Sequence, residues 1–119
     1  MNSDVEVMLY VSNLEQEAAF WQEIGFVERD RQEDVMVQVA PNDESGFALN
    51  LFSLAFIQEN TPEVANNVPS IMFHSDEIDD LYAKMQAASV EVGELVEMGL
   101  QKVFSFNNTD GLSFTVSGI

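Results

Sequence analysis

The chain has 119 residues, of which 46% are hydrophobic, and it contains no cysteine. This length fits one domain whose core needs neither disulfides nor a structural metal, and the lack of thiols excludes thiolate zinc sites and cysteine nucleophiles. Twenty-one acidic residues against four Lys and Arg give a net charge of −17. Because clustered positive charge is what holds phosphate groups, we expect neither nucleic acid nor an anionic membrane surface as a partner.

The N-terminal residues carry Asp4 and Glu6 and lack the basic-then-apolar order of a signal peptide. No apolar run approaches the roughly 20 residues that a membrane helix requires. We therefore expect a cytoplasmic protein without a membrane segment.

The first half of the chain predicts a strand, a helix and three further strands. Apolar residues alternate over residues 5–11, which is typical of a strand. A helix is predicted next, because a capping residue precedes apolar residues at helical spacing and a glycine follows them. The residues of this pattern are Asn13, Leu14, Ala18, Trp21 and Gly25. Further strands are predicted over residues 26–29, 35–40 and 47–53.

The same order recurs after a polar connector at about residues 58–68, which contains Pro62. A short strand is predicted over residues 70–74, with Ser75 and Asp76 as a capping pair for the next helix. That helix ends near Ala88, and later strands are predicted at 90–92, 102–106 and 112–116.

The two halves form an internal repeat. Residues 10–13 match residues 73–76 at an offset of 63, and Leu14 matches Ile78 at an offset of 64. Each half is a βαβββ module with one apolar sheet face, so the two modules would pack into an incomplete barrel around a cavity. The predicted class is therefore α+β, with one domain over residues 1–119. Module 1 covers about 1–57, and module 2 covers about 69–119.

Several motifs resemble the vicinal oxygen chelate superfamily, which includes glyoxalase I, extradiol dioxygenases and the bleomycin- and fosfomycin-resistance proteins. In the first half these motifs are LYVSNLE at 9–15, AFW at 19–21 and IGF at 24–26. In the second half, residues 76–82 resemble the helix start of the second module, and NTDG at 108–111 resembles its closing hairpin. The resemblance covers nearly the whole chain and implies a glyoxalase/bleomycin-resistance-like fold.

In the enzymes of this superfamily, His and Glu residues on the first and last strands of each module hold a divalent metal. The resemblance places these positions on Glu6, Asn50, Ser70 and Thr115. A catalytic metal site usually needs three His or carboxylate ligands, and only Glu6 qualifies here. We therefore predict no catalytic residue, no metal and no cofactor, which favours a binding protein over an enzyme. The sole histidine, His74, leaves an atypical site with Glu6 open.

Strand alternation places a set of mixed polar and soft apolar side chains on the face opposite the predicted core. This set comprises Glu6, Met8, Tyr10, Asn50, Ser70, Met72, His74 and Thr115. Resemblance to the resistance proteins adds Phe104 and Phe106 as aromatics for a flat ligand, although a core or dimer role for both is equally open. The alternative for the whole set is that Met8 and Met72 fill the interior and nothing binds.

The sequence thus predicts a metal-independent protein that binds and sequesters a small cationic or aromatic molecule. It is closest in type to metal-free members of the bleomycin-resistance group, and the resemblance implies a homodimer. The enzyme alternative is a divalent-metal glyoxalase- or dioxygenase-type protein that uses Glu6 and His74. A third alternative is a structural or regulatory dimer with a filled interior.

Overall fold

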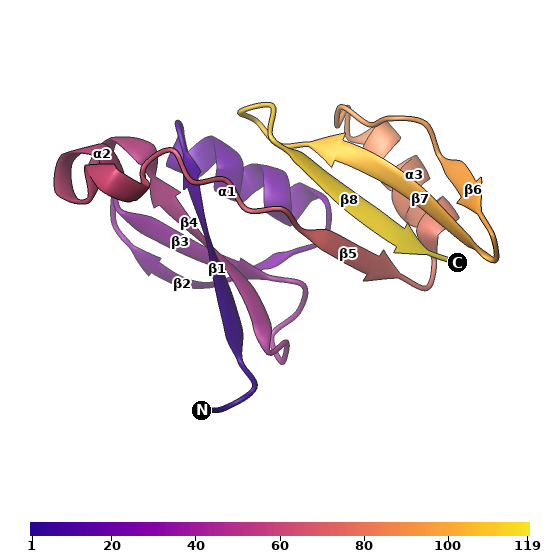
Figure 1. Cartoon of the computed structure of the whole chain (residues 1–119), viewed down its shortest axis with the longest axis horizontal. Coiled ribbons are helices and arrows are strands. Elements are labelled where there is room, and N and C mark those ends of the chain that lie inside the picture. Colours follow the sequence, from indigo (N-terminus) through magenta and orange to yellow (C-terminus); the bar gives the residue numbers. More distant parts are fainter. The chain divides into compact units, whose positions relative to one another are not determined.

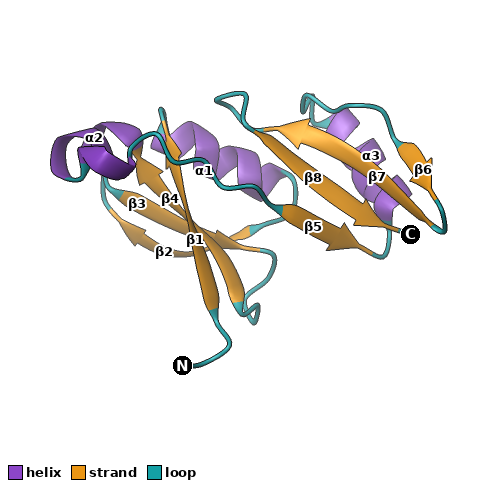
Figure 2. Cartoon of the chain, viewed as in Figure 1, coloured by secondary structure: helices purple, strands orange, loops and turns teal.

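In the computed structural model, which describes residues 1–119, the predicted strand–helix–three-strand order occurs twice (Figure 1). The chain divides into a first unit, Met1–Pro69, and a second unit, Ser70–Ile119. Each unit holds a four-stranded mixed sheet and a helix of ten residues (Figure 2). The α+β class and the two βαβββ modules are therefore confirmed, while the joining of the modules into one domain stays a prediction.

The first unit is built from elements that lie close to their predicted positions. They are β1 (Val5–Val11), α1 (Leu14–Glu23), β2 (Val27–Gln32), β3 (Met36–Ala40) and β4 (Phe47–Ser53). The strand order is β1-β4-β3-β2, with β1 parallel to β4 and the other pairs antiparallel. Asn13 caps α1 as predicted, because its side chain accepts the N–H of Gln16 at 3.0 Å.

The core of the first unit lies between α1 and one face of its sheet. Trp21, one of the apolar residues at helical spacing on α1, is fully buried there. The apolar residues of alternate parity on the strands are also fully buried, because alternate side chains of a strand point to the same face. They are Leu9, Val11, Val37, Val39, Leu49 and Leu51.

A short helix, α2 (Leu54–Asn60), spans the end of predicted module 1 and the start of the predicted connector, and a single helical turn, η1 (Pro62–Val64), follows it. The hydroxyl of Ser53 caps α2 by accepting the N–H of Phe56 at 3.3 Å, and Ile57 is buried. This helix was not predicted, because it is only seven residues long and only one of its side chains is buried.

The second unit repeats the topology of the first. Its elements are β5 (Met72–Ser75), α3 (Ile78–Ala87), β6 (Val96–Met98), β7 (Gln101–Asn107) and β8 (Ser113–Gly118). The strand order is β5-β8-β7-β6, and β5 is parallel to β8. The strand predicted at residues 90–92 is wrong, because Val92 makes only an isolated bridge with Phe106. The strand that pairs with β7 comes later and turns at Gly99, whose φ of 67° favours glycine.

The structure also corrects the repeat. The helix caps Asn13 and Glu77 are 64 residues apart, and the buried Leu9 and the half-buried Phe73 hold equivalent places opposite Leu51 and Val116. One offset of 64 therefore relates both the strands and the helices, and the predicted offset of 63 is wrong. The predicted cap is also different, because the Ser75 hydroxyl accepts the N–H of Glu77 rather than that of a residue in the helix.

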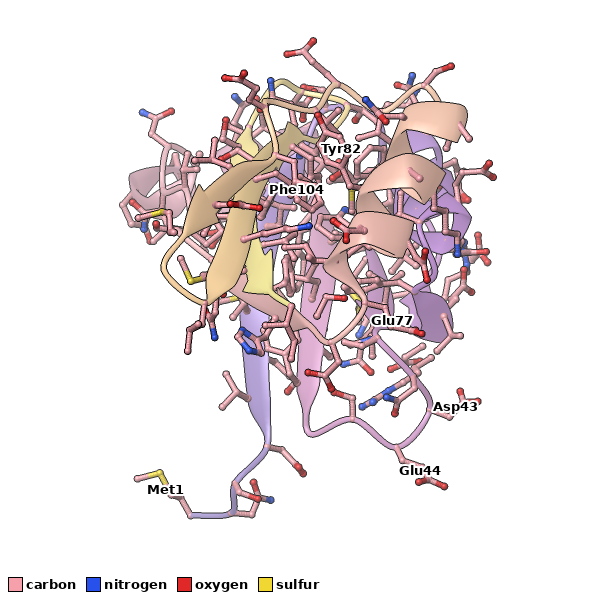
Figure 3. All side chains as sticks on the ribbon, turned by 90° about the vertical axis from the view of Figure 1, so that its right-hand side faces the viewer. Met1, Asp43, Glu44, Glu77, Tyr82 and Phe104 are labelled. Carbon is pink, nitrogen blue, oxygen red and sulfur yellow. The ribbon has the colours of Figure 1, made fainter.

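The core of the second unit is aromatic. Tyr82 on α3 packs edge-on against Phe104 on β7, with ring centroids 5.0 Å apart (Figure 3). Phe106 and Phe114 stack on the same face of the sheet at 5.6 Å. The Tyr82 hydroxyl donates to the carbonyl of Gly93 at 2.7 Å, which holds α3 to the segment that precedes β6.

Candidate functional site

In the first sheet, the face opposite α1 carries polar and soft apolar side chains, and we call it the open face. Glu6, Met8 and Tyr10 have the strand parity that avoids the core. On the neighbouring strand, Asn50 lies opposite Met8 and Phe52 lies opposite Tyr10. The structure therefore brings together four predicted site residues, Glu6, Met8, Tyr10 and Asn50, on one face.

Three adjacent strands supply a hydrogen-bonded cluster at the centre of this face, the Glu6–Gln38–Asn50 cluster. Glu6 Oε1 accepts from Gln38 Nε2 at 2.7 Å and from Asn50 Nδ2 at 3.1 Å. Gln38 Nε2 also donates to Asn50 Oδ1 at 3.0 Å. Gln38 was not predicted as a site residue, and the pairing of β3 with β4 is what sets it opposite Asn50.

Apolar groups continue the open face along β1 and β4. Met8 is 53% exposed, so its flexible thioether is available to a ligand. Beyond it, Tyr10 and Phe52 meet edge to face with ring centroids 6.4 Å apart. The open face thus changes along β1 from a carboxylate to a thioether and then to an aromatic pair.

The second sheet has an equivalent open face of different chemistry. Met72, 63% exposed, lies opposite Thr115, and His74 lies opposite Ser117. His74 Nδ1 and the Ser117 hydroxyl share a hydrogen bond of 3.0 Å. Ser70 is exposed just before β5. Where the first sheet offers a carboxylate and amides, the second offers hydroxyls and an imidazole.

Phe104 and Phe106 do not share the open face with Met72, His74 and Thr115. They are 2% and 1% exposed on the opposite face of the second sheet. Their position agrees with the core role that the sequence left open, because Phe104 packs on Tyr82 of α3. We therefore omit both from the candidate site.

A groove of about 330 Å³ lies beside β6 in the second unit. Its lining includes Val96, Met98 and Val103, and Glu94 is the one ionisable residue in it. None of these residues was predicted as part of the site, and of the predicted site residues only Phe104 contributes to the groove.

The residues at the superfamily's metal positions do not fit a divalent metal. Glu6 is the only carboxylate among them, and its Oε1 atom already accepts two amide N–H groups. Amide N–H groups repel a cation, so the cluster has no place for a metal between its members. Across the chain, no group of three His, Asp or Glu residues is arranged to hold a metal ion.

Three of the four basic side chains of the chain bond to groups other than Glu6. Arg31 bonds Glu15 at 2.5 Å and Glu28 at 2.8 Å, and Lys102 bonds Asp79 at 2.8 Å. Hydrogen bonding from the Arg31 guanidinium holds the pKa of Glu28 below its ordinary value. Arg29 donates to the carbonyl of Ser45 at 2.7 Å. None of these three side chains forms an ion pair with Glu6.

Comparison with known proteins places this arrangement in a family. The Glyoxalase/Bleomycin resistance protein/Dioxygenase superfamily matches residues 5–116. The chain belongs to this superfamily. No curated protein matches the sequence. None of the helices is long and apolar enough to span a membrane.

Solved structures share the fold over almost the whole chain. TnmS3, an antibiotic-binding protein from Streptomyces sp. CB03234, has a TM-score of 0.81 at 19% identity, covering 99% of this chain and 96% of its own. The lactoylglutathione lyase from Agrobacterium tumefaciens has a TM-score of 0.75 at 18% identity, covering 96% and 91%. A bleomycin-binding protein complexed with bleomycin has a TM-score of 0.71 at 12% identity, covering 98% of both chains. At these identities the likeness is one of fold, and the fold serves both binding proteins and an enzyme.

Proposed function

We propose that this chain is a metal-independent small-molecule-binding protein that sequesters a cationic or aromatic compound. The observation that carries the proposal is the Glu6–Gln38–Asn50 cluster beside the exposed Met8. A carboxylate without a basic partner attracts a cation, and a thioether adapts to the shape of an apolar body. The antibiotic-binding and bleomycin-binding proteins of the same fold support this reading.

The chemistry of the open face favours binding over catalysis. Glu6 is the one carboxylate in the cluster, and its two neighbours are amides that do not exchange protons near neutral pH. A general acid–base pair needs two titratable groups with separated roles. The cluster therefore has the means to hold a ligand and orient it, but not to move a proton between two groups.

The charge of the whole chain reinforces this preference for a cation. The net charge of −17 creates a negative potential that concentrates cationic solutes near the surface. This potential is non-specific and is screened by salt, whereas a contact with Glu6 depends on one position. The test must therefore separate the local contact from the general field.

A matched pair of variants makes that separation. The probe is thioflavin T, a flat aromatic cation, measured by equilibrium dialysis in salt of about 150 mM, where long-range attraction is largely screened. Glu6→Gln and Glu33→Gln each remove one negative charge, and Glu33 lies exposed in the turn between β2 and β3. We expect saturable binding to the native chain, a loss of about tenfold in Glu6→Gln, and no change in Glu33→Gln. An equal loss in both variants, or no saturable binding, would overturn the proposal.

The anionic dye anilinonaphthalene sulfonate and bleomycin extend the same assay. The proposal expects thioflavin T to bind more tightly than the anionic dye, because Glu6 repels a sulfonate. Bleomycin is included because a protein of the same fold is complexed with it. Tighter binding of the anionic dye would contradict the assignment of Glu6 as the ligand's partner.

Metal independence has its own test. The chain is incubated with Ni, Mn, Fe and Zn ions, desalted in high salt, and assayed by elemental mass spectrometry. We expect a metal content near zero per chain, because the cluster offers only the carboxylate of Glu6, whose Oε1 atom already accepts two amide N–H groups. A content near one per chain that falls in Glu6→Gln would show that the metal-dependent alternative is correct.

The proposal also includes assembly and location. Resemblance to the resistance proteins supports a homodimer, and we expect this protein to be cytoplasmic. Light scattering after size exclusion should give twice the chain mass of 13.3 kDa. A mass equal to that of one chain would contradict the homodimer while leaving ligand binding at Glu6 untouched.

A further inference from the structure

We infer that the ligand's head group is an amidinium or guanidinium, a planar cation that donates two N–H groups from one edge. This inference rests on the proposed function, because it specifies the compound that the Glu6–Gln38–Asn50 cluster would hold. It follows from which atoms of the cluster are already bonded and which are left for a ligand.

The carboxylate fixes the orientation of both amides. A carboxylate oxygen can only accept hydrogen bonds, so Gln38 and Asn50 must turn their amide nitrogens toward Glu6 Oε1. Gln38 Nε2 carries two hydrogens, and both are used, one on Glu6 and one on Asn50 Oδ1. Gln38 can therefore meet a ligand only as an acceptor, through Oε1.

Two acceptors remain for a ligand. Neither Glu6 Oε2 nor Gln38 Oε1 accepts a hydrogen bond from the chain. Each atom belongs to one of the two groups joined by the 2.7 Å hydrogen bond, and from this we infer that the two acceptors lie close together on the open face. One of them carries negative charge and the other is a neutral amide oxygen.

An amidinium edge complements this pair. Its two parallel N–H groups can reach Glu6 Oε2 and Gln38 Oε1 together, and its positive charge strengthens both bonds. A trimethylammonium group has the same charge but no N–H donor, so it would leave the Gln38 oxygen unpaired. A carboxylate ligand would meet two acceptors and no cation. The acceptor pair thus favours a cationic ligand over an anionic one, and among cations it favours one with two N–H donors.

The side chains next to the cluster fit an aromatic body attached to that head group. Met8 follows Glu6 on the same face of β1, and Tyr10 with Phe52 follows Met8. From position 6 to position 10 a strand extends roughly 13 Å, about the length of two linked rings beyond a head group. A rod-shaped aryl amidine would therefore place its rings over Met8 and its end near Tyr10.

The test compares three biphenyl compounds that differ only in the para substituent: amidine, trimethylammonium and carboxylate. Isothermal titration calorimetry is carried out on the native chain, Gln38→Met and Gln32→Met. Gln32 lies on the same face as Gln38, on β2, and its side chain makes no hydrogen bond within the chain. It therefore provides the same chemical change away from the cluster.

For the native chain, we expect the amidine to bind about tenfold more tightly than the trimethylammonium compound, and the carboxylate to bind least. Gln38→Met should abolish the preference for the amidine and leave trimethylammonium binding unchanged, while Gln32→Met keeps the preference. Equal binding of the two cations by the native chain would overturn the inference, whether or not Gln38→Met folds.

The outcomes also separate this inference from the proposed function. If both cations bind equally and both weaken in Glu6→Gln, the head-group inference fails and cation binding at Glu6 stands. If neither cation binds more tightly than the carboxylate, both the inference and the proposed function fail. A preference for the amidine that survives Gln38→Met would show that Gln38 is not the selecting group and would overturn the inference.

Discussion

Trp21 donates its indole N–H to the carboxylate of Glu17 at 2.8 Å, one helical turn away on α1, and both side chains are fully buried. Trp21 also packs against Phe26, with ring centroids 4.9 Å apart. A polar group is stable in such a core only when it is hydrogen-bonded. The pair therefore anchors α1 to the first sheet by combining apolar burial with one polar contact.

Substitution of Glu17 should show the value of that contact. Glu17→Ala leaves the buried indole N–H without its acceptor, so we expect a loss of about 1–3 kcal/mol in the free energy of unfolding. Glu17→Gln should lose less, because the amide oxygen can still accept. The exposed Glu23→Ala on the same helix is the control and should change stability by less than about 0.5 kcal/mol. Urea denaturation measures all three, and equal losses for Glu17→Ala and Glu23→Ala would contradict the role of the pair.

Gly118 is required by a close approach between β8 and β5. A Cβ atom added there would lie 1.7 Å from the carbonyl oxygen of Ser75, its partner in the parallel pair. We expect Gly118→Ala to lose about 1–3 kcal/mol, because the backbones of two paired strands must move apart. Gly93→Ala is the matched control, since its Cβ would meet the Ser105 oxygen at an ordinary 3.7 Å. A Gly118→Ala protein as stable as Gly93→Ala would contradict this packing.

Acid should weaken one surface contact of the first unit in a predictable direction. The guanidinium of Arg31 bonds both carboxylate oxygens of Glu28, at 3.1 and 2.8 Å, and holds the pKa of Glu28 below its ordinary value. A lowered folded-state pKa means that the contact stabilises the fold above the unfolded-state pKa of Glu28. That contribution is lost as the pH falls through the lower, folded-state value.

An NMR titration of the Glu28 carboxyl tests this. Arg31→Met should raise the pKa of Glu28 toward its ordinary value, whereas Arg29→Met should not change it. Arg29 is a suitable control, because it donates to the carbonyls of Asn42 and Ser45 rather than to a carboxylate. A pKa of Glu28 that is the same in the native chain and in Arg31→Met would contradict the assignment.

The sequence was sufficient to predict elements that have a strong periodic pattern. β1, α1 and β4 begin and end close to their predicted bounds, since alternation or helical spacing reaches across each of them. α2 and β6 were missed because they are short and expose most of their side chains. The one-residue error in the repeat arose because matching residue types near the strand ends outweighed strand parity.

The candidate site shows the same division. Strand parity placed Glu6, Met8 and Tyr10 on one face of the first sheet, the resemblance added Asn50, and the structure has all four on that face. Gln38 could not be found this way, because its contact with Glu6 joins residues 32 apart in the sequence through the pairing of β3 with β4. Phe104 and Lys102 lie two residues apart on β7, so their side chains point to the same face of the second sheet. The ammonium of Lys102 bonds Asp79 on α3, which shows that this face is the one covered by the helix.

The most direct measurement is a heteronuclear NMR titration with thioflavin T that follows the side-chain amide signals. If the ligand binds at the Glu6–Gln38–Asn50 cluster, the signals of Gln38 and Asn50 should shift saturably, while those of Gln32 stay in place. The shifts should disappear in Glu6→Gln and persist in Glu33→Gln. Saturable binding that leaves the Gln38 and Asn50 amides unmoved would contradict the account, because the ligand would then be held somewhere else on the chain.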